Sequence, residues 1–286
     1  MLNYILLLFS DMMLALNFTV TKMYQKRTGV SLALGLKFNA LLGVFSAVIF
    51  FAVNGFKCDF NLFSVVMAFI MAACCIGYTV VGFYIMQEEK MALYTVFLMT
   101  GGMSVPYVWG LIFLGEEFSV LRTLGLIVVA AAVFVVNAGS KNINKKQLLM
   151  CLSVFFFNGF VSVVSKEHQI NSNAVSAQNF VILTSIAKTL LCIPALLFAG
   201  MKNSKPSHIG ADSLLFVFFA AVWSGISYFL QLRGAAHLPA TVLYPFVTGG
   251  SIVFTAFAGK IFFKEILNRR MIAGIILCFL GTSMFL

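Results

Sequence analysis

Apolar stretches about as long as a bilayer is thick follow one another along almost the whole sequence. A helix needs about 20 residues to cross roughly 30 Å of hydrocarbon, whereas a barrel strand needs about ten residues with strict apolar–polar alternation. The stretches have the helical length and do not alternate; they occupy residues 3–22, 31–53, 63–85, 91–114, 120–138, 147–165, 175–199, 213–232, 239–260 and 270–286. We therefore predict an all-α integral membrane protein with ten transmembrane helices.

The composition agrees with a lipid environment. Hydrophobic residues make up 61% of the 286 residues and charged residues only 10%, against about a quarter charged in soluble domains. The formal net charge is +10, but the Lys and Arg residues are spread over short connections and form no basic face. We expect contact with the lipid bilayer, no nucleic-acid partner and a multi-pass location in the plasma membrane.

The reactive residues form no recognisable catalytic or metal-binding pattern. Six cysteines are scattered without a CxxC pair, and His168, His208 and His237 lie far apart at expected loop positions. No nucleotide-binding motif is present. We therefore expect no metal, no cofactor and no enzymatic activity.

The chain also repeats itself. Residues 91–138 align without gaps with residues 239–286, at an offset of 148. The offset pairs Thr100-Gly101-Gly102 with Thr248-Gly249-Gly250, Glu117 with Glu265 and Arg122 with Arg270, and an offset of 144 pairs Lys22 with Lys166. Each copy holds five spans, an odd number, so the second copy must cross the membrane in the opposite direction. We predict two inverted five-helix repeats, residues 1–140 and 141–286, within one membrane unit, as in many secondary transporters.

This pattern resembles the drug/metabolite transporter superfamily, in particular its EamA-like ten-helix branch. The resemblance is carried by Leu114-Gly115-Glu116-Glu117, which is similar to the Gly-Glu that closes the family's fourth helix, by Lys264-Glu265 in the second half, and by Leu34-Gly35-Leu36-Lys37-Phe38. Ala15-Leu16-Asn17 replaces the tryptophan-glycine usual in the first helix, and Pro106 is shifted from the usual proline of helix four. The resemblance implies a carrier with a central cavity and with helices five and ten at the periphery.

Polar side chains recur at helical spacing inside the apolar stretches. Unpaired polar atoms in hydrocarbon are costly, so such stripes line a wet cavity or form hydrogen bonds between helices. The paired Thr-Gly-Gly elements leave two interpretations open as well, exposed carbonyls for a substrate or tight packing of helix four against helix nine. We expect the substrate cavity to be lined by Asn17, Thr100, Asn158, Ser162, Lys188, Trp223, Ser224, Ser227, Tyr228, Gln231 and Thr248.

Charged residues inside the spans are the other functional candidates. Lys188 is expected to bind a carboxylate or phosphate, or to pair with Asp11, and Asp11 is a candidate for exchanging a proton during transport. Glu117 and Glu265 are expected to pair with Arg122 and Arg270 as structural latches.

The charge distribution also bears on orientation. The odd-numbered connections hold thirteen Lys and Arg residues and the even-numbered ones four, which places the odd connections in the cytoplasm and both termini outside. The family resemblance implies termini inside.

These features predict a secondary carrier that moves a small, polar, amino-acid-like metabolite by alternating access, in the direction of efflux. The alternatives are an uptake carrier and a non-transporting membrane scaffold. The duplication makes a monomer sufficient, and a dimer is compatible with it.

Overall fold

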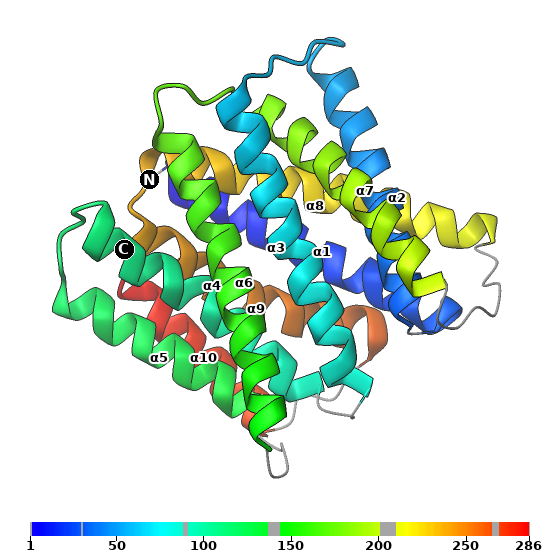
Figure 1. Cartoon of the computed structure of the whole chain (residues 1–286). Helices are drawn as coiled ribbons and strands as arrows, with labels where there is room; N and C mark the ends of the chain where they lie inside the picture. The colour runs from blue at the N-terminus through cyan, green and yellow to red at the C-terminus, as the bar shows by residue number, and fades with distance from the viewer. Residues whose placement is uncertain are drawn as a thin grey trace.

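A computed structural model shows ten helices packed into one bundle (Figure 1). It describes residues 2–29, 31–87, 91–136, 144–200, 210–264 and 269–285, and no strand occurs in these ranges. The helices are α1 (Leu2–Thr28), α2 (Leu32–Val53), α3 (Leu62–Gln87), α4 (Met91–Phe113), α5 (Val120–Val136), α6 (Lys145–Ile170), α7 (Ala177–Gly200), α8 (Ala211–His237), α9 (Ala240–Phe263) and α10 (Arg269–Ser283). The all-α prediction is confirmed.

Three helices run further than their apolar stretches. The apolar stretches of α1, α6 and α8 end near residues 22, 165 and 232, but the helices continue to Thr28, Ile170 and His237. The added residues include Lys, Gln and Arg, which form helix readily. At its other end, α6 begins with a capping box, in which Asn144 Oδ1 accepts from the Gln147 N–H (2.8 Å) and Gln147 Oε1 accepts from the Asn144 N–H (3.0 Å).

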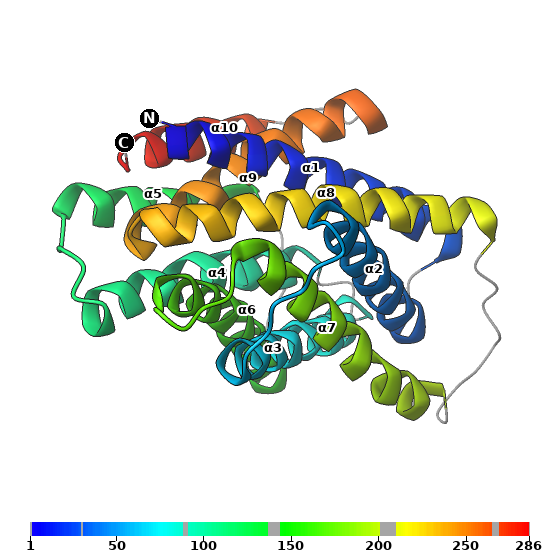
Figure 2. The ribbon, with the colours of Figure 1, turned by 90° about the horizontal axis from the view of Figure 1, so that it is seen from above.

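Eight of the described helices, α1 to α4 and α6 to α9, are long and apolar enough to cross a membrane. The other two are shorter than predicted spans, with 17 residues in α5 and 15 in α10. At 1.5 Å per residue, 17 residues extend about 25 Å, a little less than the usual hydrocarbon thickness. The two short helices pack against each other at the edge of the bundle (Figures 1 and 2).

Both chain termini lie at the same end of the bundle, which we call the terminal end (Figures 1 and 2). The Tyr4 hydroxyl near the N-terminus donates to the Phe285 carbonyl near the C-terminus (3.4 Å). The connections after α2 and α6 meet there through Asn61 Nδ2 and the Asn173 carbonyl (2.6 Å). Helices α1 and α6, which begin the two proposed repeats, therefore run in opposite directions, as an inverted duplication requires.

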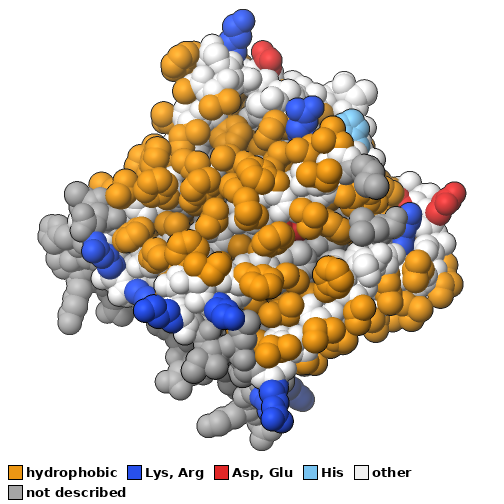
Figure 3. All heavy atoms as spheres, turned by 180° about the vertical axis from the view of Figure 1, so that it is seen from behind, with side chains coloured by type: hydrophobic (Ala, Val, Ile, Leu, Met, Phe, Trp, Pro, Cys, Tyr) orange, Lys and Arg blue, Asp and Glu red, His pale blue; other side chains and the backbone are white. Residues whose placement is uncertain are grey.

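The opposite end, where α1 stops and α6 starts, is the basic end. The described Lys and Arg residues nearest to it are Lys22, Lys26, Arg27, Lys145, Lys146, Lys260, Lys264, Arg269 and Arg270. Figure 3 shows a broad apolar surface on one face of the molecule, with Lys and Arg side chains along its lower edge. This arrangement suits a multi-pass membrane protein, because the apolar surface faces lipid and the charges face water.

The helices are organised as two related groups of three. Helix α6 contacts α3 and α4, which together form the α6 triad, and α1 contacts α8 and α9, which together form the α1 triad. Exchanging α6 with α1, α3 with α8 and α4 with α9 converts one triad into the other. Helix α2 packs on α7, and α5 packs on α10. The boundary between the predicted repeats lies within residues 137–143, outside the described residues, and stays a prediction.

A substitution at Gly101 tests how tightly α4 packs on α6. A Cβ atom at this position would come within 2.6 Å of the Phe155 Cα atom. Because the obstacle is backbone, Gly101→Ala forces the two helices apart, and we expect it to lower stability by about 1–3 kcal/mol. Thermal unfolding in detergent measures the loss, and Gly35→Ala is the control, since a Cβ atom there meets nothing within 4 Å. Equal melting temperatures for the two variants would contradict the packing.

Candidate functional site

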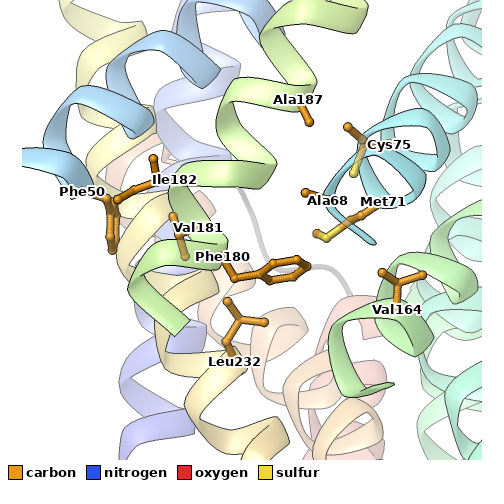
Figure 4. Packing of buried hydrophobic residues seen from close by; sticks show 11 residues of the cluster. Phe50, Ala68, Met71, Cys75, Val164, Phe180, Val181, Ile182, Ala187 and Leu232 are labelled. Atoms are coloured by element: carbon orange, nitrogen blue, oxygen red, sulfur yellow. The ribbon is translucent and has the colours of Figure 1, made fainter. Parts of the chain in front are cut away.

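Apolar clusters join the two triads at the terminal end. One cluster brings Leu232 of α8 together with Val164 of α6, and Figure 4 shows Phe180 of α7 pointing in among Met71, Val164 and Leu232. A second cluster joins α4 to α9 at the same end, with Met103, Tyr107 and Val242 among its members.

Near the basic end, two of the described clusters stay on one side or the other. One lies within the α6 triad and contains Ile85, Cys151 and Val154, and the other joins α1, α2 and α8 through Tyr24, Phe38, Val217 and Ala220. A further cluster, which includes Val96 and Ile252, joins α4 to α9 beside α5 and α10. Among the described residues, the triads are therefore most firmly joined toward the terminal end.

Polar contacts across the triads follow the same distribution. The Tyr228 hydroxyl of α8 lies 3.3 Å from Ser165 Oγ of α6 and 3.0 Å from Met71 Sδ of α3. The Tyr244 hydroxyl of α9 donates to the Ser162 carbonyl of α6 (2.6 Å). The structure thus brings the expected site residues Ser162 and Tyr228 to the boundary between the triads.

Ser227 and Gln231 of the expected site form a hydrogen-bonded group with Ser10. Ser10 Oγ donates to the Ser227 carbonyl (3.0 Å), and Gln231 Nε2 donates to Ser227 Oγ (3.0 Å) and to Ser10 Oγ (3.3 Å). Ser227 is buried, whereas Gln231 is half-buried. This group joins α1 to α8, so part of the polar stripe forms the interhelical hydrogen bonds that were the alternative to a wet cavity.

Asn158 and Ser162 use carbonyls of α4. Asn158 Nδ2 donates to the Leu98 carbonyl (2.7 Å), and Ser162 Oγ donates to the Gly102 carbonyl (3.1 Å). The Thr100 hydroxyl donates to the Val96 carbonyl in its own helix (2.6 Å). Both donors from α6 remain half-buried.

The two Thr-Gly-Gly elements do not pack against each other. Gly101 and Gly102 adjoin Phe155 and Asn158 of α6, Gly250 adjoins Asp11 of α1, and Gly249 adjoins Thr282 of α10. The interpretation that these glycines pack helix four against helix nine is wrong, because the glycines adjoin α6, α1 and α10 instead. The first element lets α4 approach α6, the second lets α9 approach α1, and Gly249 in addition admits α10.

Asp11 is fully buried, and neither of its carboxylate oxygens has a hydrogen-bond partner in the part of the chain that the structure describes. A Cβ atom at Gly250 would overlap with Asp11 Oδ2, so the glycine makes room for the carboxylate. Four further buried oxygens of α1 and α9 also lack a hydrogen-bond partner among the described residues: Asn17 Oδ1, the Tyr24 hydroxyl, Thr241 Oγ1 and Thr255 Oγ1. These helices therefore hold several polar atoms that the described residues do not satisfy.

Lys188 is half-buried near the middle of α7 and forms no hydrogen bond or ion pair with another residue of the described ranges. In particular, the expected alternative of a Lys188–Asp11 bridge is not formed. The lysine charge acts on the Cys192 thiol, which lies one helical turn further along α7. Three more expected site residues, Trp223, Ser224 and Thr248, are half-buried on α8 and α9, and the Ser224 hydroxyl donates to the Ala221 carbonyl (3.4 Å).

The expected ion pair between Glu117 and Arg122 is not formed. Glu117 is exposed and forms no ion pair with Arg122, while Glu265 lies outside the described residues. The neighbouring Glu116 acts instead, since its Oε1 accepts from the Ala240 N–H (2.6 Å) and its Oε2 from the Thr241 N–H (2.8 Å). Sequence reasoning selected the second glutamate because the repeat offset aligned it with Glu265.

Lys166 was recognised only as a repeat marker, but it binds the end of α8. Its Nζ donates to the Ala235 carbonyl (2.8 Å) and to the Leu238 carbonyl (2.6 Å). A cation is favoured at a helix C-terminus, where carbonyls point outward.

The loop position expected for His168 is wrong, because the residue lies in α6 and is buried. Its Nε2 is 2.9 Å from Ser64 Oγ and its Nδ1 is 2.9 Å from Gln169 Nε2. The ring stacks on Phe63 and Phe180, with centroid distances of 5.8 and 3.6 Å. Both ring nitrogens are thus occupied in a packing role.

Sequence reasoning also missed a group of tyrosines near Cys75 of α3. Tyr78 and Tyr228 pack against the apolar cluster that contains Cys75, and Tyr94 packs with Tyr78 against the neighbouring cluster of Ile85. These residues come from α3, α4 and α8, so the group bridges the two triads. Tyrosines and cysteines inside apolar stretches look like packing residues in a sequence, and only the fold brings them together.

Comparison with known proteins agrees with this architecture. A solved crystal structure matches with a TM-score of 0.76 and 12% identity, over 98% of this chain and 94% of its own, which establishes likeness of fold alone. None of the curated proteins matches the chain. Residues 145–286 match the EamA-like transporter family. This match of the second half of the chain supports membership of the drug/metabolite transporter superfamily.

Proposed function

We propose that the protein is a secondary carrier that moves a small, polar, amino-acid-like metabolite out of the cell by alternating access. The family of its second half is one of membrane transporters of small solutes. The observation that carries the proposal is the uneven junction of the described parts of the triads. Two apolar clusters and several polar contacts join them at the terminal end, whereas one cluster, that of Val96 and Ile252, joins them toward the basic end. Two related groups that part at one end and then at the other would expose a site between them alternately.

The proposed substrate site lies between the triads at mid-depth. Its walls are the half-buried polar side chains of α6 and α8, above all Asn158, Ser162, Ser224, Tyr228 and Gln231. Most of their observed hydrogen bonds use one donor or acceptor and leave others free for a solute. The remaining proposed lining residues are Asn17, Thr100, Lys188, Trp223, Ser227 and Thr248.

Lys188 gives the proposed site its charge preference. An ammonium group without a partner, half-buried in a membrane-spanning helix, is costly unless a ligand or water satisfies it. A carboxylate is the group that an amino-acid-like solute would bring. The same proposal includes transport in the direction of efflux rather than uptake, a location in the plasma membrane, and a monomer as the working unit.

A ligand-stabilisation screen on the purified protein tests the substrate class. Among amino acids, amines, sugars and phosphates, we expect carboxylate-bearing solutes to raise the melting temperature, and Lys188→Ala to abolish that rise because the counter-charge is lost. Lys57→Ala is the matched control, since Lys57 is exposed in the connection after α2. A rise that survives in Lys188→Ala would make Lys188 a structural residue, and a non-transporting scaffold would show no rise with any solute.

Asp11 is the proposed coupling residue. A buried carboxylate without hydrogen bonds is far less costly when it carries a proton, and no neighbouring charge among the described residues acts on it. We test this with a solute identified by the screen. We expect Asp11→Asn proteoliposomes still to exchange internal for external solute, but no longer to accumulate the solute when a pH gradient is applied. Asp59→Asn, in the connection after α2, should retain both. Gradient-driven accumulation by Asp11→Asn would assign coupling to another group.

A further inference from the structure

We propose that Glu116 and Lys166 form a charged latch over the turn between α8 and α9, and that this latch must release before the terminal end can open. The inference rests on the proposed alternating access and adds to it the contact that holds one end closed. Lys166 lies in α6, and Glu116 lies in the connection that follows α4, so both charges are attached to the α6 triad. The turn joins α8 to α9 and belongs to the α1 triad. Any separation of the triads at this end breaks the latch.

Glu116 supplies the cap that the start of α9 lacks. The N-cap residue Pro239 makes no side-chain cap bond. The two carboxylate oxygens of Glu116 accept instead from the Ala240 and Thr241 N–H groups, at 2.6 and 2.8 Å. An anion is favoured at a helix N-terminus, where unpaired N–H groups and the helix dipole both attract it.

Two glycines hold Glu116 in this position. Gly115 has a φ of +63°, which turns the chain sharply after α4, and the Glu116 N–H then donates to the Gly110 carbonyl (3.0 Å). A Cβ atom at Gly110 would lie 2.7 Å from Glu116 Oε2. The side chain can therefore fold across α4 toward α9 only because position 110 has no side chain.

Lys166 binds the other half of the same turn. Its ammonium group donates to the carbonyls of Ala235 and Leu238, which end α8, at 2.8 and 2.6 Å. Glu116 lies within electrostatic range of Lys166. A negative charge on the N-terminus of α9 and a positive charge on the C-terminus of α8 thus match both helix dipoles, and four charge-assisted hydrogen bonds would break together.

The repeat alignment gives Glu116 no acidic counterpart in the second half. The offset of 148 aligns Glu116 with Lys264, and the offset of 144 aligns Lys166 with Lys22. Lys22 lies over the Phe263 ring at 4.5 Å, a contact between α1 and α9 within one triad. The four hydrogen bonds of the latch favour a resting state that is closed at the terminal end.

Hydrogen–deuterium exchange of the full-length protein in lipid nanodiscs tests the latch without a ligand. The variants are Glu116→Gln and Lys166→Met, each of which keeps the size of the side chain and removes its charge. We expect about tenfold faster exchange across residues 235–244 and across the end of α6, together with unchanged or slower exchange at the basic ends of α1 and α8. Glu117→Gln is the matched control, because this neighbouring glutamate is exposed.

Equal exchange in Glu116→Gln and Glu117→Gln would overturn the latch. Faster exchange at both ends of the bundle would also overturn it, since that pattern marks a general loss of stability. The outcome is independent of the carrier proposal. If Glu116→Gln speeds exchange at the terminal end but the protein transports no solute, the carrier proposal alone is refuted. If the protein transports a solute but Glu116→Gln leaves exchange unchanged, the latch alone is refuted.

Discussion

Hydrocarbon cannot form hydrogen bonds, and this constraint accounts for the polar contacts inside the bundle. Each polar group inside a span must find its partner in the protein or in water. Asn158 and Ser162 meet the constraint with carbonyls of α4, and Ser10, Ser227 and Gln231 meet it with one another. Asp11 does not meet it among the described residues, which makes this carboxylate the clearest internal indication of a mobile proton.

The same constraint explains the contrast between the two ends. At the terminal end, tyrosine hydroxyls, Lys166 and Glu116 connect the triads through backbone groups that a helix leaves unpaired at its ends. Backbone groups at helix ends have no partner within their own helix, so they are suitable partners for contacts that form and break. Side chains within the triads, such as Ser227, use partners that move with them.

The helices could be predicted closely from the sequence because apolar length is a local property. The starts of α2, α3 and α4 lie within one residue of their expected positions. The ends of α1, α6 and α8 were missed, since the residues that extend them are polar and depend on contacts that a window of hydropathy does not contain. Lys166 shows this directly, as its partners Ala235 and Leu238 are about 70 residues away in the chain.

The candidate site was predictable in its residue types but less so in its pairings. Ser162 and Tyr228 lie at the boundary of the triads as a shared cavity would require, whereas Ser227 also joins α1 to α8 through Ser10. The choice of Glu117 over Glu116 failed because adjacent glutamates are indistinguishable in a repeat alignment of low identity. Only the turn at Gly115 decides which of the two faces α9.

If one site between the triads faces the two ends in turn, a thiol placed at residue 224 must become accessible from each end in turn. The native Cys58, outside the helices, is a weak competitor for thiol reagents, because burial and the Asp59 carboxylate raise the pKa of its thiol. In a background with Cys58→Ser, we expect Ser224→Cys in sealed vesicles to react with a membrane-impermeant thiol reagent from the basic end in the resting protein, and from the terminal end only while a solute is being carried. Labelling from both ends at once, or from neither under any condition, would rule out alternating access to this site.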